Sequence, residues 1–188
     1  RAYQYEESSF PEEKKRIGWR ASELVSDGAT IILDTGTTVM EVARQIVRYK
    51  DVTVVTNALN VATWLENYAE IKVIVTGGTL RATQHSLVNP YADFVLERIY
   101  ADIAFIGANG IDAHYGVTNV NIPEAEMKIR FMKASRRRIL VADSSKIGNV
   151  ARAKVGKLED FDLFITDNQA DPEQVWLIQE AGLPVEMV

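Results

Sequence analysis

Small polar residues that could bind an anion follow the first apolar run of this 188-residue chain. The segment Asp34-Thr35-Gly36-Thr37-Thr38 leads into a stretch with helical spacing. Gly36 lets the backbone approach a ligand closely, the helix start offers N–H groups and a positive dipole end, and Thr37 and Thr38 add hydroxyl donors. The pattern predicts a phosphate cradle; the alternative is an ordinary helix cap and turn. It lacks the Gly-Lys-Thr ending of a Walker loop.

The C-terminal ends of two further apolar runs, here called run ends, carry residues with similar chemistry. Thr56 and Asn57 follow the second apolar run, and Gly77 and Gly78 follow the third. Paired glycines permit a close backbone approach, and Arg81 just beyond them could bind an anion. A helix cap at Asn57 and a flexible turn at the glycines are the structural alternatives.

Later segments add an amide, two acids and a cation. Asn109 and Asp112 follow the fourth run, and Asp112 there could bind hydroxyl groups. Lys146 follows the fifth run, where it could act as a point charge for a phosphate. Glu124 lies in the first turn of a predicted helix, where an acid also suits the helix dipole. Each residue alone has an ordinary structural explanation, but together the five run ends have the composition of a polyol-phosphate site.

Two histidines and no cysteines limit the other chemistries. The absence of cysteine excludes disulfides, thiolate metal sites and a cysteine nucleophile. His85 and His114 fall in predicted loops without metal-ligand spacing, so we expect neither a metal nor another cofactor. A surface or hydrogen-bonding role is the default for both, although His85 follows the third run closely enough to line the ligand site.

The elements that must position these residues are strands alternating with helices. The apolar runs are nearly continuous, which is typical of strands buried on both faces of a parallel sheet. The segments between them have helical spacing. The alternation predicts an α/β fold with a doubly wound, mainly parallel sheet and helices on both faces. The expected strands are 30–34, 52–56, 71–76, 102–107, 138–142, 162–166 and 184–187.

Two segments are less regular. We expect a loop at 81–90 followed by a helix at 91–99, and either a small hairpin or an extended excursion at 111–120. No linker or repeat interrupts the chain, so residues 1–188 are predicted to form a single effector-binding domain.

Charge and hydropathy restrict the partners. A net charge of −5 makes the chain a poor non-specific binder of nucleic acid. No apolar run approaches the roughly 20 residues of a membrane span, and the start has no signal-peptide pattern. We therefore expect a cytoplasmic protein without a membrane partner. Because the sequence starts at Arg1 rather than at methionine, we expect it to be the C-terminal part of a longer protein.

The ordered set of motifs resembles the C-terminal sensor domain of DeoR-type bacterial transcriptional repressors. The resemblance covers essentially the whole chain. It rests on the segments 13–17, 34–38, 54–57, 77–78, 107–112, 116–118, 124–128, 143–146 and 165–167. One departure is Asn89, which stands where the family often has glycine, so the loop at 81–90 is expected to differ in shape.

The resemblance implies a fold similar to ribose-5-phosphate isomerase and CoA-transferases. It also implies a phosphorylated sugar or related sugar-catabolic effector, homo-oligomers, and binding to operator DNA through an N-terminal winged helix-turn-helix that is absent from this chain. Carried over by position, the effector site comprises Asp34, Gly36, Thr37, Thr38, Thr56, Asn57, Gly77, Gly78, Asp112, Glu124 and Lys146. We add Arg81, His85 and Asn109 to the predicted site because they follow apolar runs.

The leading hypothesis is therefore a non-enzymatic domain that senses a sugar phosphate for a repressor of sugar-utilisation genes. The rival is an isomerase-type enzyme of the related fold, which needs a carboxylate base beside a phosphate-anchored sugar. Glu124, Glu126 and Asp112 are the candidate acids. A purely structural oligomerisation domain is a third alternative, but it would leave the polar run ends without a purpose.

Overall fold

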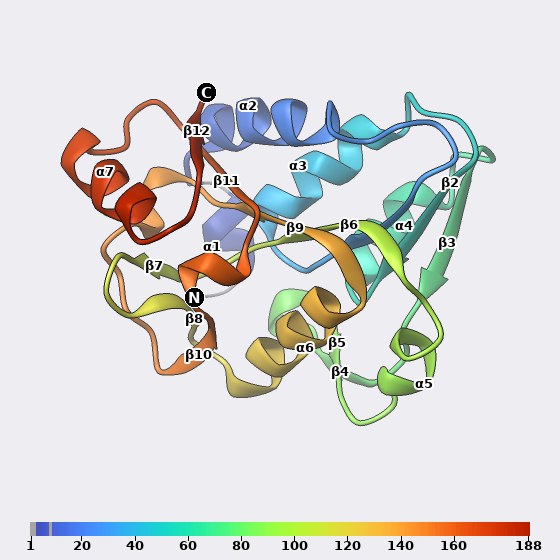
Figure 1. Ribbon diagram of the computed structural model, residues 1–188. Helices are drawn as coiled ribbons and strands as arrows, with labels where there is room; N and C mark the ends of the chain where they lie inside the picture. The colour runs from blue at the N-terminus through green and yellow to red at the C-terminus, as the bar shows by residue number, and fades with distance from the viewer. Residues whose placement is uncertain (1–2, 8) are drawn as a thin grey trace.

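The computed structural model describes residues 3–7 and 9–188, and a seven-stranded parallel sheet forms its centre (Figure 1). The strand order is β12-β11-β9-β6-β1-β2-β3, and every neighbouring pair in it runs parallel. The strands are β1 (Thr30–Leu33), β2 (Val52–Thr56), β3 (Ile71–Val75), β6 (Ala101–Ile106), β9 (Ser135–Val141), β11 (Leu163–Thr166) and β12 (Val185–Met187). The predicted parallel α/β fold is confirmed.

Helices cover both faces of this sheet. Alternate residues of a strand point to opposite faces, so Ile31 and Leu33 enter one apolar core and Ile32 enters the other. The first core is closed by α2 (Pro11–Ser22), α3 (Thr37–Ile46) and α4 (Leu59–Leu65), and the second by α5 (Asp93–Leu96), α6 (Ile122–Lys133) and α7 (Pro172–Glu180). In Figure 1, α2 and α3 lie above the sheet, and α6 and α5 lie below it. A short helix, α1 (Tyr3–Glu7), precedes α2.

The segment at 81–90 is not the predicted loop. It holds most of an antiparallel hairpin made of β4 (Thr79–Arg81) and β5 (Ser86–Val88), with a 3-10 turn, η1 (Ala82–Gln84), at its tip. The hairpin is fixed by contacts that a local pattern does not reveal. The Leu87 N–H donates to the Asn57 carbonyl at 2.8 Å, and the Leu59 N–H donates to the His85 carbonyl at 2.8 Å. The helix predicted at 91–99 is confined to α5.

The second irregular segment is a hairpin, one of the two predicted alternatives. β7 (Gly110–Asp112) and β8 (Gly116–Asn119) pair antiparallel, and β10 (Ala153–Gly156) adds a third strand beside β8. β10 was not predicted, because its four residues gain their pairing only from a partner more than 30 residues away. Two further 3-10 turns, η2 (Ser144–Lys146) and η3 (Leu158–Asp160), complete the elements.

The strand order places a crevice between β1 and β6. Successive strands extend the sheet in one direction from β1 to β3 and then in the other direction from β6 to β12. In open α/β sheets, ligands bind beyond the carboxyl ends of the strands at such a reversal. The residues after Leu33 and after Ile106 therefore lie where a ligand is expected.

The close contact between α2 and α3 depends on Gly18. A Cβ atom at this position would lie 2.6 Å from the carbonyl carbon of Glu41 in α3. We expect Gly18→Val to lower the free energy of unfolding by about 1–3 kcal/mol, because overpacking forces the helices apart. Urea denaturation measures the change. Lys15→Val, on an exposed position of the same helix, is the control, and equal stability of the two variants would contradict this account of the packing.

Candidate functional site

A cavity of about 530 Å³ opens at the crevice between β1 and β6. Its walls come from the loop after β1 with the start of α3, the loops after β6 and β9, and the first half of α6. The junction between β8 and α6, residues near the start of the chain and the tip of the β4–β5 hairpin complete the lining. This volume is within the range of small-molecule sites.

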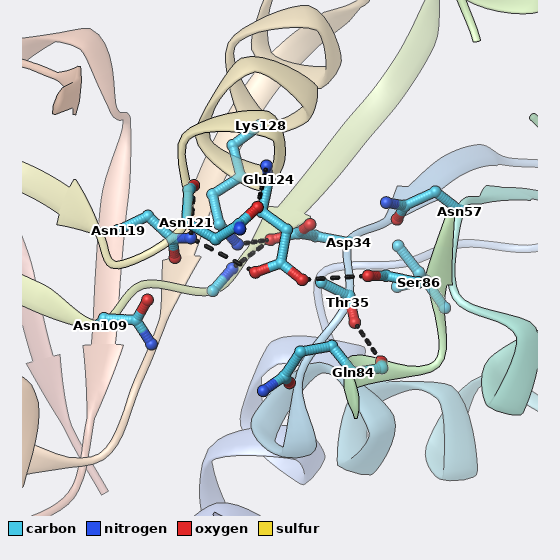
Figure 2. A network of polar contacts seen from close by, with 12 residues as sticks. Asp34, Thr35, Asn57, Gln84, Ser86, Asn109, Asn119, Asn121, Glu124 and Lys128 are labelled. Atoms are coloured by element: carbon cyan, nitrogen blue, oxygen red, sulfur yellow. Dashed lines mark hydrogen bonds and ion pairs between the residues drawn. The ribbon is translucent and has the colours of Figure 1, made fainter. Parts of the chain in front are cut away.

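A buried ion pair lies at the base of the site. Asp34 and Lys128 are 0% and 3% exposed, and the Lys128 ammonium donates a hydrogen bond to Asp34 Oδ2. The same oxygen accepts from the Gly107 N–H at 3.0 Å, so one carboxylate joins the ends of β1 and β6 to α6 (Figure 2). Burial raises the pKa of the Asp34 carboxyl, and the Lys128 charge opposes that shift.

Glu124 ties α6 to the β4–β5 hairpin. Asn121 caps α6, because its Oδ1 accepts from the Glu124 N–H at 3.0 Å. The Glu124 Oε1 atom then accepts from Arg81 Nη1 and from Ser86 Oγ, each at 3.0 Å, while Asn119 Nδ2 lies 3.4 Å from Oε2. Figure 2 shows this carboxylate between Asn119 and Ser86. Arg81 thus lines the cavity paired with this acid.

The start of α3, where the sequence predicts an anion cradle, lies at the cavity. Gly36 is the N-cap residue, with φ 126° and ψ 162°, and no described side chain caps the helix. A Cβ atom at Gly36 would meet no atom of the described chain within 4 Å, so the backbone there faces open space. Gly36, Thr37 and Thr38 all line the cavity. A ten-residue helix directs its N–H groups and positive dipole end toward this space.

The loop after β9 brings Lys146 to the same cavity. Asp167 holds this loop, since its Oδ2 accepts from the Ser144 N–H at 2.6 Å, and Asp143 Oδ1 accepts from the Ser145 N–H at 3.1 Å. The Lys146 ammonium lies 2.8 Å from the Glu6 Oε2 atom of α1. Of the fourteen predicted residues, Gly36, Thr37, Thr38, Arg81, Asn109, Glu124 and Lys146 line the cavity.

Within the described chain, the remaining predicted residues lie outside the lining. Thr56 donates to the Leu33 carbonyl at 2.7 Å, and Asn57 donates to the Leu87 carbonyl at 2.8 Å, both buried. Gly77 and Gly78 lead into β4, and a Cβ atom on Gly78 would lie 2.3 Å from the Val88 oxygen. Thr56 therefore joins β2 to β1, and Asn57 and Gly78 contact the hairpin.

Three more predicted residues have structural contacts. Asp112 caps the turn between β7 and β8, because its Oδ1 accepts from the His114 and Tyr115 N–H groups at 2.8 Å each. The His85 ring meets the Tyr3 ring edge-on, with centroids 5.1 Å apart. Asp34 lies behind Lys128 instead of in the lining.

Several lining residues escaped the sequence analysis. Lys128 follows Glu124 by one helical turn, so the two share a face of α6, and that spacing could have identified it. Asn119 and Asn121 flank the point where β8 turns into α6, and a pair of amides before a helix was an available signal. Gln84 and Glu6 reach the cavity from distant segments, and no sequence pattern identified them.

Comparison with known proteins identifies the family. The model of the DeoR C terminal sensor domain matches residues 9–168. The chain belongs to the DeoR sensor-domain family. It is 38% identical over 174 residues to the HTH-type transcriptional regulator GlpR of Haloferax volcanii, covering 93% of this chain and 68% of that protein. It is 30% identical to the glycerol-3-phosphate regulon repressor of Escherichia coli K12, covering 83% of this chain and 62% of that repressor.

A solved structure shares the fold of this DeoR-type domain. Ribose 5-phosphate isomerase A from Methanocaldococcus jannaschii superposes with a TM-score of 0.54 at 20% identity, covering 74% of this chain and 55% of that enzyme. The predicted likeness to this isomerase fold is confirmed. Among residues 3–7 and 9–188, no helix has the length and apolar character of a membrane span.

The buried pair generates a stability prediction for the DeoR-type domain. We expect Lys128→Met to lower the free energy of unfolding by about 3–5 kcal/mol near neutral pH, because it leaves the Asp34 carboxylate buried without its cation. The loss of Lys128 raises the folded-state pKa of Asp34 further. The penalty therefore shrinks as the pH falls through that raised pKa, and it is smallest below about pH 4, where the carboxyl is protonated in both the folded and the unfolded state. Urea denaturation across this pH range measures both effects.

The double variant Asp34→Asn/Lys128→Met is expected to recover much of the loss, because neither member of the pair then carries a buried charge. Lys133→Met, at an exposed position of the same helix, is the matched control. A single Lys128→Met variant as stable as the parent at neutral pH would show that the pair does not hold the site together.

Proposed function

We propose that the cavity binds a phosphorylated sugar or a related sugar-catabolic phosphate, and that this ligand is the effector of a DeoR-type repressor of sugar-utilisation genes. One observation carries the proposal: the uncapped start of α3 and the Lys146 ammonium line the same cavity at the strand reversal. A helix start and a lysine together match the charge and the hydrogen-bonding capacity of a phosphate.

The rest of the lining suits hydroxyl groups. Asn109, Asn119 and Asn121 supply amides, and Glu124 supplies a carboxylate beside them. Asn109 is already oriented, because its Oδ1 accepts from the Val120 N–H at 2.8 Å. The hydroxyl groups of a polyol can donate to and accept from such groups. In a phosphorylated polyol, the phosphate would lie at the start of α3 and Lys146, and the hydroxyl groups would lie at the amides and Glu124.

The same proposal covers the full-length regulator, and it rests there on family membership. The domain would act in the cytoplasm as a homo-oligomer, with operator DNA bound by an N-terminal domain. Effector binding would shift an equilibrium between two states of that assembly by binding one state more tightly. The names of its relatives, among them a glycerol-3-phosphate regulon repressor, support the phosphate class.

An isomerase activity is the second candidate because the fold is shared with ribose 5-phosphate isomerase A. Glu124 is poorly placed to act as its base, since both carboxylate oxygens accept hydrogen bonds from Arg81, Ser86 and Asn119. Incubation with ribose 5-phosphate, followed by NMR, tests turnover. Product formation that Glu124→Gln abolishes would favour the enzyme over the sensor.

A thermal-shift screen with a panel of sugar phosphates, followed by calorimetric titration of those that bind, tests the proposed site. A panel member that raises the melting temperature of the domain by mass action identifies the ligand class, and the titration gives its affinity. We expect Lys146→Ala to weaken binding of that ligand by about 10- to 150-fold, the equivalent of a hydrogen bond to a charged group.

The matched control is Lys154→Ala, an exposed lysine in β10 outside the cavity lining. It should bind the ligand as the parent does. Equal affinity in Lys146→Ala and parent would remove Lys146 from the site, and no binding across the panel would contradict the proposed function.

A further inference from the structure

Helix α1 lies against the cavity and is anchored at its first residue. Tyr3 is 5% exposed, and its hydroxyl accepts from Asn60 Nδ2 at 2.8 Å. Its ring meets the His85 ring edge-on, at the tip of the β4–β5 hairpin. Burial raises the pKa of Tyr3 to about 12. A short polar helix is thus fixed by one buried aromatic side chain at one end.

The other end of α1 is held by two lysines at Glu6. The Glu6 carbonyl accepts from the Lys14 ammonium at 2.5 Å, and Lys14 is 2% exposed. The Glu6 Oε2 atom pairs with the Lys146 ammonium at 2.8 Å, with side chains 18% and 15% exposed. The second contact joins segments 140 residues apart. Burial lowers the pKa of Lys14, and the Glu6 and Asp143 charges oppose that shift.

Glu6 and Lys146 both line the cavity proposed for the effector. A carboxylate oxygen at hydrogen-bonding distance from an ammonium group has the charge and the atom type that a phosphate oxygen would present there. Glu6 is therefore already paired with Lys146, the cation that the proposed function assigns to the phosphate of the ligand.

We propose that Glu6 is an internal competitor for the phosphate subsite at Lys146, so that a bound phosphate displaces its carboxylate and loosens α1. This inference rests on the proposed function and adds how its site is regulated. A phosphate that takes Lys146 leaves Glu6 as a like charge beside it, which disfavours the docked position of α1. The ligand then binds the loosened state more tightly than the docked one, as any population shift requires.

The position of α1 suggests how the displacement of Glu6 could affect the rest of the regulator. The family model is that of a C-terminal sensor domain, so under the proposed function the DNA-binding part of the regulator would precede α1. Loosening α1 would alter how that part is held against the sensor. The docked state also lowers the apparent ligand affinity, because only the undocked fraction is competent to bind at Lys146.

The test compares Glu6→Gln with Glu7→Gln, which removes the same charge from the exposed neighbouring position of α1. Calorimetry with inorganic phosphate and with ribose 5-phosphate measures affinity. We expect Glu6→Gln to bind about tenfold more tightly than the parent, because a neutral amide competes less well for the ammonium, and Glu7→Gln to match the parent.

Hydrogen exchange at residues 3–7, followed by mass spectrometry, reports the release itself. We expect saturating phosphate to speed exchange there in the parent, and Glu6→Gln and Lys146→Ala to show faster exchange without any ligand. Exchange unchanged by Lys146→Ala would overturn the idea that this ion pair holds α1.

The possible results distinguish a failure of the Glu6 competition from a failure of the proposed function. Equal affinities of parent and Glu6→Gln would overturn the competition while leaving the phosphate site in place. An equal gain in phosphate affinity in Glu7→Gln would show that the effect depends only on net charge, and this result would also overturn the competition. Failure of both parent and Glu6→Gln to bind either phosphate, or any sugar phosphate of the panel, would overturn the proposed function, and the inference with it.

Discussion

The buried charge of Asp34 is the constraint on which the site depends. A carboxylate that is 0% exposed at the end of β1 needs compensation, and it receives it from the Gly107 N–H and the Lys128 ammonium. Those two partners belong to the loop after β6 and to α6, so satisfying one charge fixes two strand ends and a helix relative to each other. Glu124 lies one turn before Lys128 and extends the arrangement to the β4–β5 hairpin. The cavity is the space that these elements enclose.

Each cation in the described lining is paired with an acid of the same chain. Lys128 pairs with Asp34, Arg81 with Glu124, and Lys146 with Glu6. The first pair is fully buried and structural, and the second closes a network of four residues. The third pair is the exception, because its acid comes from a five-residue helix instead of the sheet or α6. Under the proposed function, an anionic ligand would displace this acid most easily, and its binding at Lys146 would then affect the position of α1.

The sheet could be predicted from the sequence because its strands are nearly continuous apolar runs, and the polar residues after β1, β6 and β9 follow directly from them. Gly36, Thr37, Thr38 and Lys146 were located in this way. Thr56, Asn57, Gly77 and Gly78 also stand at strand ends, yet Thr56 bonds the neighbouring strand β1, Asn57 bonds the hairpin, and Gly77 and Gly78 lead into it. Its three-residue strands and long-range hydrogen bonds leave no local pattern. Glu6 was missed for a related reason, since α1 is too short and polar for its periodicity to be detected.

The most direct test of the proposed phosphate site is to locate the ligand on the protein. Amide chemical shifts of an isotope-labelled sample, followed by NMR during titration with a sugar phosphate, report the site residue by residue. We expect the amides of Gly36, Thr37 and Thr38 to shift together with that of Lys146, at one shared affinity. Shifts confined to the separate hollow near His114 and Lys157, with those four amides unchanged, would contradict the proposed site.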